Sequence, residues 1–177
     1  MAINLSGQDA AAHRLLSCVH LLRKQYDKAI AESQKAVELD PNSSGVNFIY
    51  GMVLQAAGQY EEAIPVLKKA IRLNPVTPIN YLNNLAWAYT GVKQYEQAIP
   101  LWNRAVERNP DYLFAYMGLT AANQVLGQEN RARECAAELI RIKPNFSVTL
   151  VEKQLMVRTE EDKKHILEAF RKAGIPE

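Results

Sequence analysis

Gln59-Tyr60-Glu61-Glu62-Ala63 and the nearby Ala70-Ile-Arg-Leu-Asn-Pro75 are two blocks of sequence that recur along the chain. The first block returns as Gln25-Tyr26-Asp27-Lys28-Ala29 and as Gln94-Tyr95-Glu96-Gln97-Ala98. The second ends in a proline four times, at spacings of 34, 35 and 34 residues: Pro41, Pro75, Pro110 and Pro144. The alanines keep the same spacing: Ala29, Ala63, Ala98 and Ala132. Two markers that stay in step through one insertion indicate an internal repeat.

Each repeat is predicted to form two helices, because its apolar residues recur at three- and four-residue steps. In the second repeat these residues are Tyr50, Val53, Leu54, Ala57, Tyr60, Ala63, Ile64, Leu67, Ala70 and Ile71. Gly58 breaks the run between the two helices, and the proline after each second helix cannot continue it. Small residues such as Gly51 and Ala86 would let helix backbones approach closely. The one-residue insertion is expected in the loop Val76-Thr77-Pro78.

The small, tyrosine, alanine and proline residues that recur at these repeat positions resemble those of the tetratricopeptide repeat (TPR) family over about residues 10–144. The resemblance implies an all-α fold, a right-handed superhelical solenoid of antiparallel helix pairs with C-terminal capping helices. We expect one TPR domain over residues 1–177, with repeats at about 10–43, 44–78, 79–112 and 113–146 and capping helices in 147–177. The fourth repeat matches least well, because it departs from the pattern at Asn123, Glu129 and Leu139.

The C-terminal end is predicted to close the array, because a repeat stack leaves an apolar face open at each end. Residues 146–157 can pack on the fourth repeat. Residues 160–173 are expected to form an amphipathic helix that ends at Gly174, with Ile166, Leu167 and Phe170 on its apolar side. The tail from Phe170 to Glu177 is similar to the one that closes TPR regions of bacterial class III adenylate/guanylate cyclases. That resemblance implies that the chain is the C-terminal module of a larger signalling protein and that the chain itself carries no cyclase chemistry.

Composition and charge argue against several classes of partner. The 177 residues carry a formal net charge of +2, too small for a nucleic-acid-binding protein with a concentrated basic stripe. No apolar run reaches the roughly 20 residues that span a bilayer, and the first eight residues lack the layout of a secretory signal. Cys18 and Cys135 show neither disulfide nor zinc spacing. We therefore predict a cytoplasmic protein that binds no nucleic acid and does not insert into membranes.

His13, Cys18 and His20 form the one cluster that could hold a metal or a nucleophile. The two histidines are seven residues apart on one helix face, but they fall in repeat columns that mostly serve packing. No third ligand and no orienting acid are evident, and no Gly-rich phosphate loop is present. Packed histidines are the favoured interpretation, with no catalytic residue, metal or cofactor expected; a metalloprotein or enzyme is the alternative.

The predicted binding site follows from the resemblance, because in TPR-like stacks the first helix of each repeat lines a concave surface. Asparagine amides can bind a peptide backbone, and aromatic and methionine side chains can bury apolar groups. The predicted groove residues are Phe48, Met52, Asn80, Asn83, Asn84, Trp87, Phe114, Met117 and Gln124. The alternative is that several of them pack between repeats.

Two functions remain open at this point. The first is a non-enzymatic interaction module that binds a peptide or helix in its groove. Its mostly neutral residues do not suit a clamp for a C-terminal carboxylate, since among the matching columns only Arg14 is cationic. The second is a self-associating regulatory domain of a cyclase-like protein, in which exposed ends pair symmetrically to give a homo-oligomer.

Overall fold

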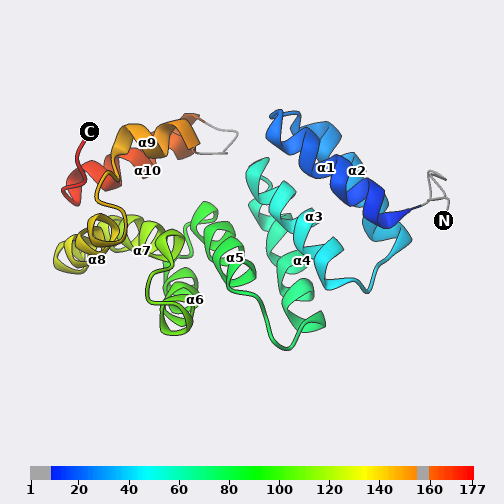
Figure 1. Cartoon of the computed structure of the whole chain (residues 1–177), viewed down its shortest axis with the longest axis horizontal. Helices are drawn as coiled ribbons and strands as arrows, with labels where there is room; N and C mark the ends of the chain where they lie inside the picture. The colour runs from blue at the N-terminus through cyan, green and yellow to red at the C-terminus, as the bar shows by residue number, and fades with distance from the viewer. Residues whose placement is uncertain (1–8, 155–159) are drawn as a thin grey trace. The chain divides into compact units, whose positions relative to one another are not determined.

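The computed structural model describes residues 9–154 and 160–177, and all regular elements in these ranges are α-helices (Figure 1). Consecutive helices pair, as the contacts of α1 with α2, α3 with α4 and α7 with α8 show. In chain order the helices are α1 (Ala10–Leu22), α2 (Tyr26–Leu39), α3 (Ser44–Ala56), α4 (Tyr60–Leu73), α5 (Ile79–Gly91), α6 (Tyr95–Arg108), α7 (Leu113–Val125), α8 (Glu129–Ile142), α9 (Val148–Gln154) and α10 (Glu160–Lys172).

The chain divides into two compact units, Met1–Asn84 and Leu85–Glu177. The boundary lies inside α5, so the first unit holds α1 to α4 with the start of α5, and the second holds the rest. Each unit has its own buried core, and they are described separately below.

In the first unit, the alanine columns of the repeat bring the paired helices together. Ala29 and Ala63 are completely buried at the helix crossings. A methyl group added at Gly51 on α3 would lie 2.6 Å from Cγ of Leu67 on α4, so these backbones approach as closely as a glycine permits. The insertion lies in the loop before α5, where Thr77 adopts a positive φ of 36°.

The second unit repeats this arrangement around Trp102, the largest side chain that is fully buried. The alanines Ala98, Ala105 and Ala132 are fully buried as well. The indole of Trp102 on α6 packs against Gly118 on α7, where any side chain would overlap it. Large and small residues therefore alternate across the helix contacts, as close packing requires.

The C-terminal helices close the second unit. Helix α10 packs on α7 and α9, and Phe170 and Phe146 meet edge to face with ring centroids 6.1 Å apart. The backbone N–H of Val148 donates to the carbonyl of Pro176 at 2.8 Å, which ties the tail to the start of α9. Gly174 follows α10 with a φ of 90°, as expected for a glycine that ends a helix. Of the predicted 146–157 segment, residues 155–157 lie outside the described ranges.

Candidate peptide-binding surface

By their helical spacing, the predicted groove residues share one side of each first helix that carries them, and we call this side of a first helix the first-helix face. In the first unit, the ring of Phe48 is only 7% exposed and stacks flat on Tyr81, with centroids 4.1 Å apart and an interplanar angle of 6°. The packing between α3 and α5 therefore occupies Phe48, which leaves little of its ring for a ligand. Met52 is half-buried against the core cluster that includes Leu21 and Val53.

The three asparagines of α5 differ in accessibility. Asn80 is exposed, and its backbone carbonyl accepts a hydrogen bond of 2.8 Å from Nδ2 of Asn84. Asn84 is half-buried, and Asn83 is buried at 8% exposure with further interactions of its own. Asn80 therefore presents the most accessible amide of the three to a peptide backbone.

In the second unit, the aromatic residues of the face have different surroundings. Trp87 is half-buried and meets the buried indole of Trp102 edge to face, at 5.3 Å and 74°. Phe114 is 53% exposed, and its ring lies tilted beside that of Tyr112 at 5.8 Å. Met117 is half-buried against the cluster that α10 completes. Phe114 is thus the most exposed aromatic residue of the predicted set.

Helix α7 also carries buried polar atoms, one of which belongs to the predicted groove residue Gln124. The Oε1 of Gln124 is buried without a hydrogen-bond partner, as are Oγ1 of Thr120 and Oδ1 of Asn123. An unsatisfied buried acceptor costs about 1–3 kcal/mol. The departure of Asn123 from the repeat pattern was the signal available in the sequence.

The structure gives both histidines of the His13, Cys18 and His20 cluster a structural partner. The Nδ1 of His13 lies 2.6 Å from Oε2 of Glu32, which joins α1 to α2. The Nδ1 of His20 lies 2.7 Å from Oε1 of Gln25 in the following turn. Within residues 9–154 and 160–177, no group of three or more His, Cys, Asp or Glu side chains could hold a metal ion.

Cys135 is also unsuited to nucleophilic chemistry. Burial raises the pKa of its thiol to about 11, helped by the negative charges of Glu134 and Glu138. The thiol is therefore protonated near neutral pH, whereas the thiolate is the reactive form.

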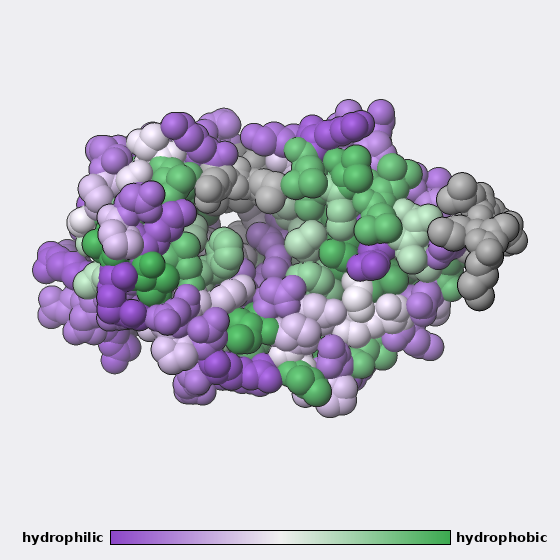
Figure 2. Space-filling model, in the orientation of Figure 1, coloured by the Kyte–Doolittle hydropathy of each residue, from purple (hydrophilic) through white to green (hydrophobic). Residues whose placement is uncertain are grey.

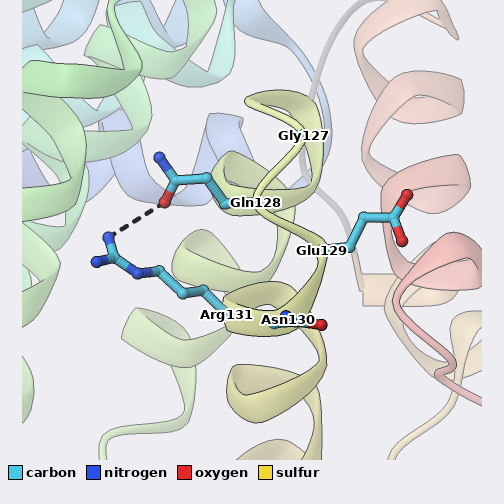
Figure 3. Close-up of a pocket in the computed structure, with 5 residues that line it drawn as sticks. All are labelled: Gly127, Gln128, Glu129, Asn130 and Arg131. Atoms are coloured by element: carbon cyan, nitrogen blue, oxygen red, sulfur yellow. Dashed lines mark hydrogen bonds between the residues drawn. The ribbon is translucent and has the colours of Figure 1, made fainter.

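A hollow of about 580 Å³ lies at the turn between α7 and α8 (Figure 3). It is lined by the consecutive residues Gly127, Gln128, Glu129, Asn130 and Arg131. Figure 3 shows the Arg131 side chain reaching back to Gln128, whose Oε1 accepts a hydrogen bond of 3.2 Å from it. The lining residues that the structure describes all come from a single turn and the helix start that follows, so they bring together no groups from different elements.

Comparisons with known proteins agree with the repeat pattern. Residues 79–112 match the model of the tetratricopeptide repeat family, and residues 2–70 match a model described as anaphase-promoting complex, cyclosome, subunit 3. No curated protein matches the sequence. Neither match extends beyond residue 112, so the cyclase-like tail stays a prediction.

Solved structures of similar fold include PilW, a widely conserved type IV pilus biogenesis factor. It has a TM-score of 0.76 at 17% identity, over 95% of this chain and 76% of that chain. YrrB, described as a TPR protein with an unusual peptide-binding site, has a TM-score of 0.65 at 21% identity, over 97% and 88%. MamA from Desulfovibrio magneticus RS-1 has a TM-score of 0.69 at 22% identity, over 93% and 92%.

The chain therefore has the fold of tetratricopeptide-repeat proteins, and residues 79–112 match one such repeat in sequence. The predicted fold class, an all-α solenoid of helix pairs, is confirmed. No helix in the described part of the chain is long and apolar enough to cross a membrane.

Proposed function

We propose that this protein is a non-enzymatic interaction module that holds a peptide or a helix of another protein on its first-helix face. The observation that carries the proposal is the exposure of Phe114 at the start of α7. A single exposed apolar side chain is common in soluble proteins. Phe114 is distinctive because Met117, one helical turn further on, is also partly accessible on the same side of α7.

The chemistry of this face favours an apolar ligand segment. On α7 its columns hold Phe114, Met117, Ala121 and Gln124, with no cation that could pair with a carboxylate or phosphate. An aromatic ring and a thioether instead offer adaptable contacts to apolar side chains. In the first unit, Asn80 offers an exposed amide that can both donate to and accept from a peptide backbone. YrrB, which has a similar fold, is itself described as having a peptide-binding site.

The experiment is selection from a random peptide library on the full chain, followed by calorimetric titration of the selected peptides. We expect Phe114→Ala to weaken binding by about 1–3 kcal/mol, as for an interface hot spot. Because the Phe114 side chain is largely exposed, its removal should leave the fold intact.

The matched control is Val76→Ala, which removes an exposed apolar side chain from the loop before α5. Its affinity should equal that of the unchanged protein. Equal affinity of the Phe114→Ala variant and the unchanged protein would place the ligand elsewhere, and a library that yields no binder in solution would count against the module itself.

A further inference from the structure

Helix α1 exposes an unusual number of large apolar side chains. Leu15, Leu16, Val19 and Leu22 are 59%, 42%, 41% and 71% exposed. Together with the exposed Ala12 they form one face of the helix, the α1 face. Figure 2 shows hydrophobic side chains gathered over α1. Contiguous exposed apolar surface of this kind marks an interaction site more often than single exposed residues do.

The repeat shows what this face normally does. Val19 aligns with Val53 of α3 and Ala122 of α7, and both of these are completely buried. In the first unit, Val53 and Ala56 pack into a cluster with Leu21 and Ala29, so α3 uses this face to stack on the preceding helix pair. The α1 face is therefore the stacking surface of a repeat, and in α1 it is exposed.

We propose that the α1 face docks on the α1 face of a second copy of this chain, with the two helices antiparallel. Ala12, Leu15, Val19 and Leu22 follow a three-four-three spacing, which keeps apolar residues facing a partner helix in a coiled coil. In an antiparallel pair about a two-fold axis, residues near the start of one helix lie opposite residues near the end of the other. Ala12 of each copy lies opposite Leu22 of the other, and Leu15 lies opposite Val19.

Charge complementarity selects this orientation. Asp9 caps the start of α1, where its carboxylate accepts from the N–H of Ala11 at 2.9 Å. Arg23 and Lys24 follow the other end of the helix. Antiparallel pairing places Asp9 of each copy beside Lys24 of the other and opposes the two helix dipoles. Parallel pairing would bring like charges together at both ends. Exposed ion pairs add little affinity, so these charges select orientation.

End-to-end stacking of copies is disfavoured because α10 closes the C-terminal end with charged residues. The exposed side chains that the structure describes on α10 are Glu160, Glu161, Lys164, His165, Glu168, Arg171 and Lys172. Docking the α1 face there would strip these charges of water without apolar contact in return. Self-pairing of α1 gives a closed dimer instead. Its interface spans one 13-residue helix from each copy, at the small end of specific interfaces, so we expect a dissociation constant in the micromolar range.

Sedimentation equilibrium over a range of concentrations tests the proposal. We expect a monomer–dimer equilibrium that Leu15→Glu combined with Leu22→Glu weakens about 100-fold, since Leu15 lies near the centre of the pairing and Leu22 is the most exposed apolar side chain of the α1 face. The control combines Leu39→Glu with Val76→Glu, two exposed apolar positions outside α1, and adds the same charge without changing dimerisation. Circular dichroism verifies that each variant is folded.

A chain that stays monomeric throughout, a dimer indifferent to the α1 changes, or a mass that grows beyond the dimer would each overturn the proposal. The first outcome is the one expected if another segment or partner covers the face.

Orientation is tested by crosslinking a chain in which Cys18 and Cys135 are replaced by serine. Antiparallel pairing separates the two copies of residue 12 by roughly 15 Å, ten residues along the helix axis, beyond a short thiol crosslinker. Ala12→Cys combined with Leu22→Cys should therefore give crosslinked dimers, and neither single change should. Crosslinking of either single variant would show parallel pairing and overturn the proposed arrangement.

Discussion

The indole of Trp102 on α6 lies directly against Gly118 on α7, the first helix of the next repeat. In the first unit, the residue at the same repeat position, Leu67, lies instead against Gly51 of its own repeat. The larger indole reaches across to the following helix and also meets Trp87. At this repeat position, Leu67 contacts the first helix of its own repeat, whereas Trp102 contacts the first helix of its own repeat and that of the next.

Gly118→Ala is expected to destabilise the protein by at least about 2 kcal/mol, because the added methyl group overlaps a fully buried ring. The measurement is urea unfolding followed by circular dichroism. The control is Gly45→Ala, where the nearest atom is Oγ of Ser43 at 4.0 Å. That change should be neutral or slightly stabilising, since alanine favours a helix over glycine. An equal effect of the two changes would contradict the packing described.

Trp87→Ala is expected to reduce stability as well as any binding, because the ring packs edge to face on Trp102. The loss should be about 2–3 kcal/mol, below the value for a fully buried tryptophan. Phe114→Ala should cost less than about 1 kcal/mol, because more than half of that side chain is already in water. Thermal unfolding of both variants tests the contrast, and equal losses would show that Phe114 is also part of the core.

Acid should weaken the contact between α1 and α2. The hydrogen bond from His13 holds the pKa of Glu32 below its ordinary value, and the charge of Lys35 acts in the same direction. The unfolded chain therefore takes up this proton at a higher pH than the folded chain. The stabilisation is complete above the ordinary pKa of glutamate, about 4.5, and is lost as the pH falls through the lowered value. In Glu32→Gln this part of the acid dependence of unfolding free energy should disappear; an unchanged profile would contradict it.

Cys135 should react slowly with iodoacetamide. With a pKa of about 11, only a very small fraction of its thiol is ionised at pH 8. In a Cys18→Ser variant, mass spectrometry should show alkylation of the folded chain far slower than in denaturant, with acceleration above pH 10. Alkylation of the folded chain as fast as that of a free cysteine would contradict the burial of this thiol.

The helices could be predicted from the sequence because their signals are local. Ala29 and Ala63 are the fully buried alanines of the paired helices, and Pro75 follows two residues after the end of α4, where a proline cannot continue the helix. The apolar side of α10 was likewise predictable: Ile166, Leu167 and Phe170 are all buried.

Accessibility along the first-helix face could not be predicted in the same way, because it depends on neighbouring helices. Phe48 and Phe114 were both expected to face a ligand, yet Tyr81 covers the first while the second stays exposed. The exposure of the α1 face could not be predicted either. Val19 and Val53 are identical residues at the same repeat position, yet Val19 is exposed and Val53 is buried. The position of a residue in the repeat determines which side of the helix its side chain points to. Whether that side chain is buried depends on which neighbouring helix packs against that side.

Amide hydrogen exchange with and without a selected peptide tests the interaction module most directly, since it locates the contact along the chain. The first helices α5 and α7 should gain protection on binding, with the largest change near Phe114, while α4, α6 and α8 remain as before. Protection confined to the second helices, or to the turn from Gly127 to Arg131, would contradict a binding site on the first-helix face.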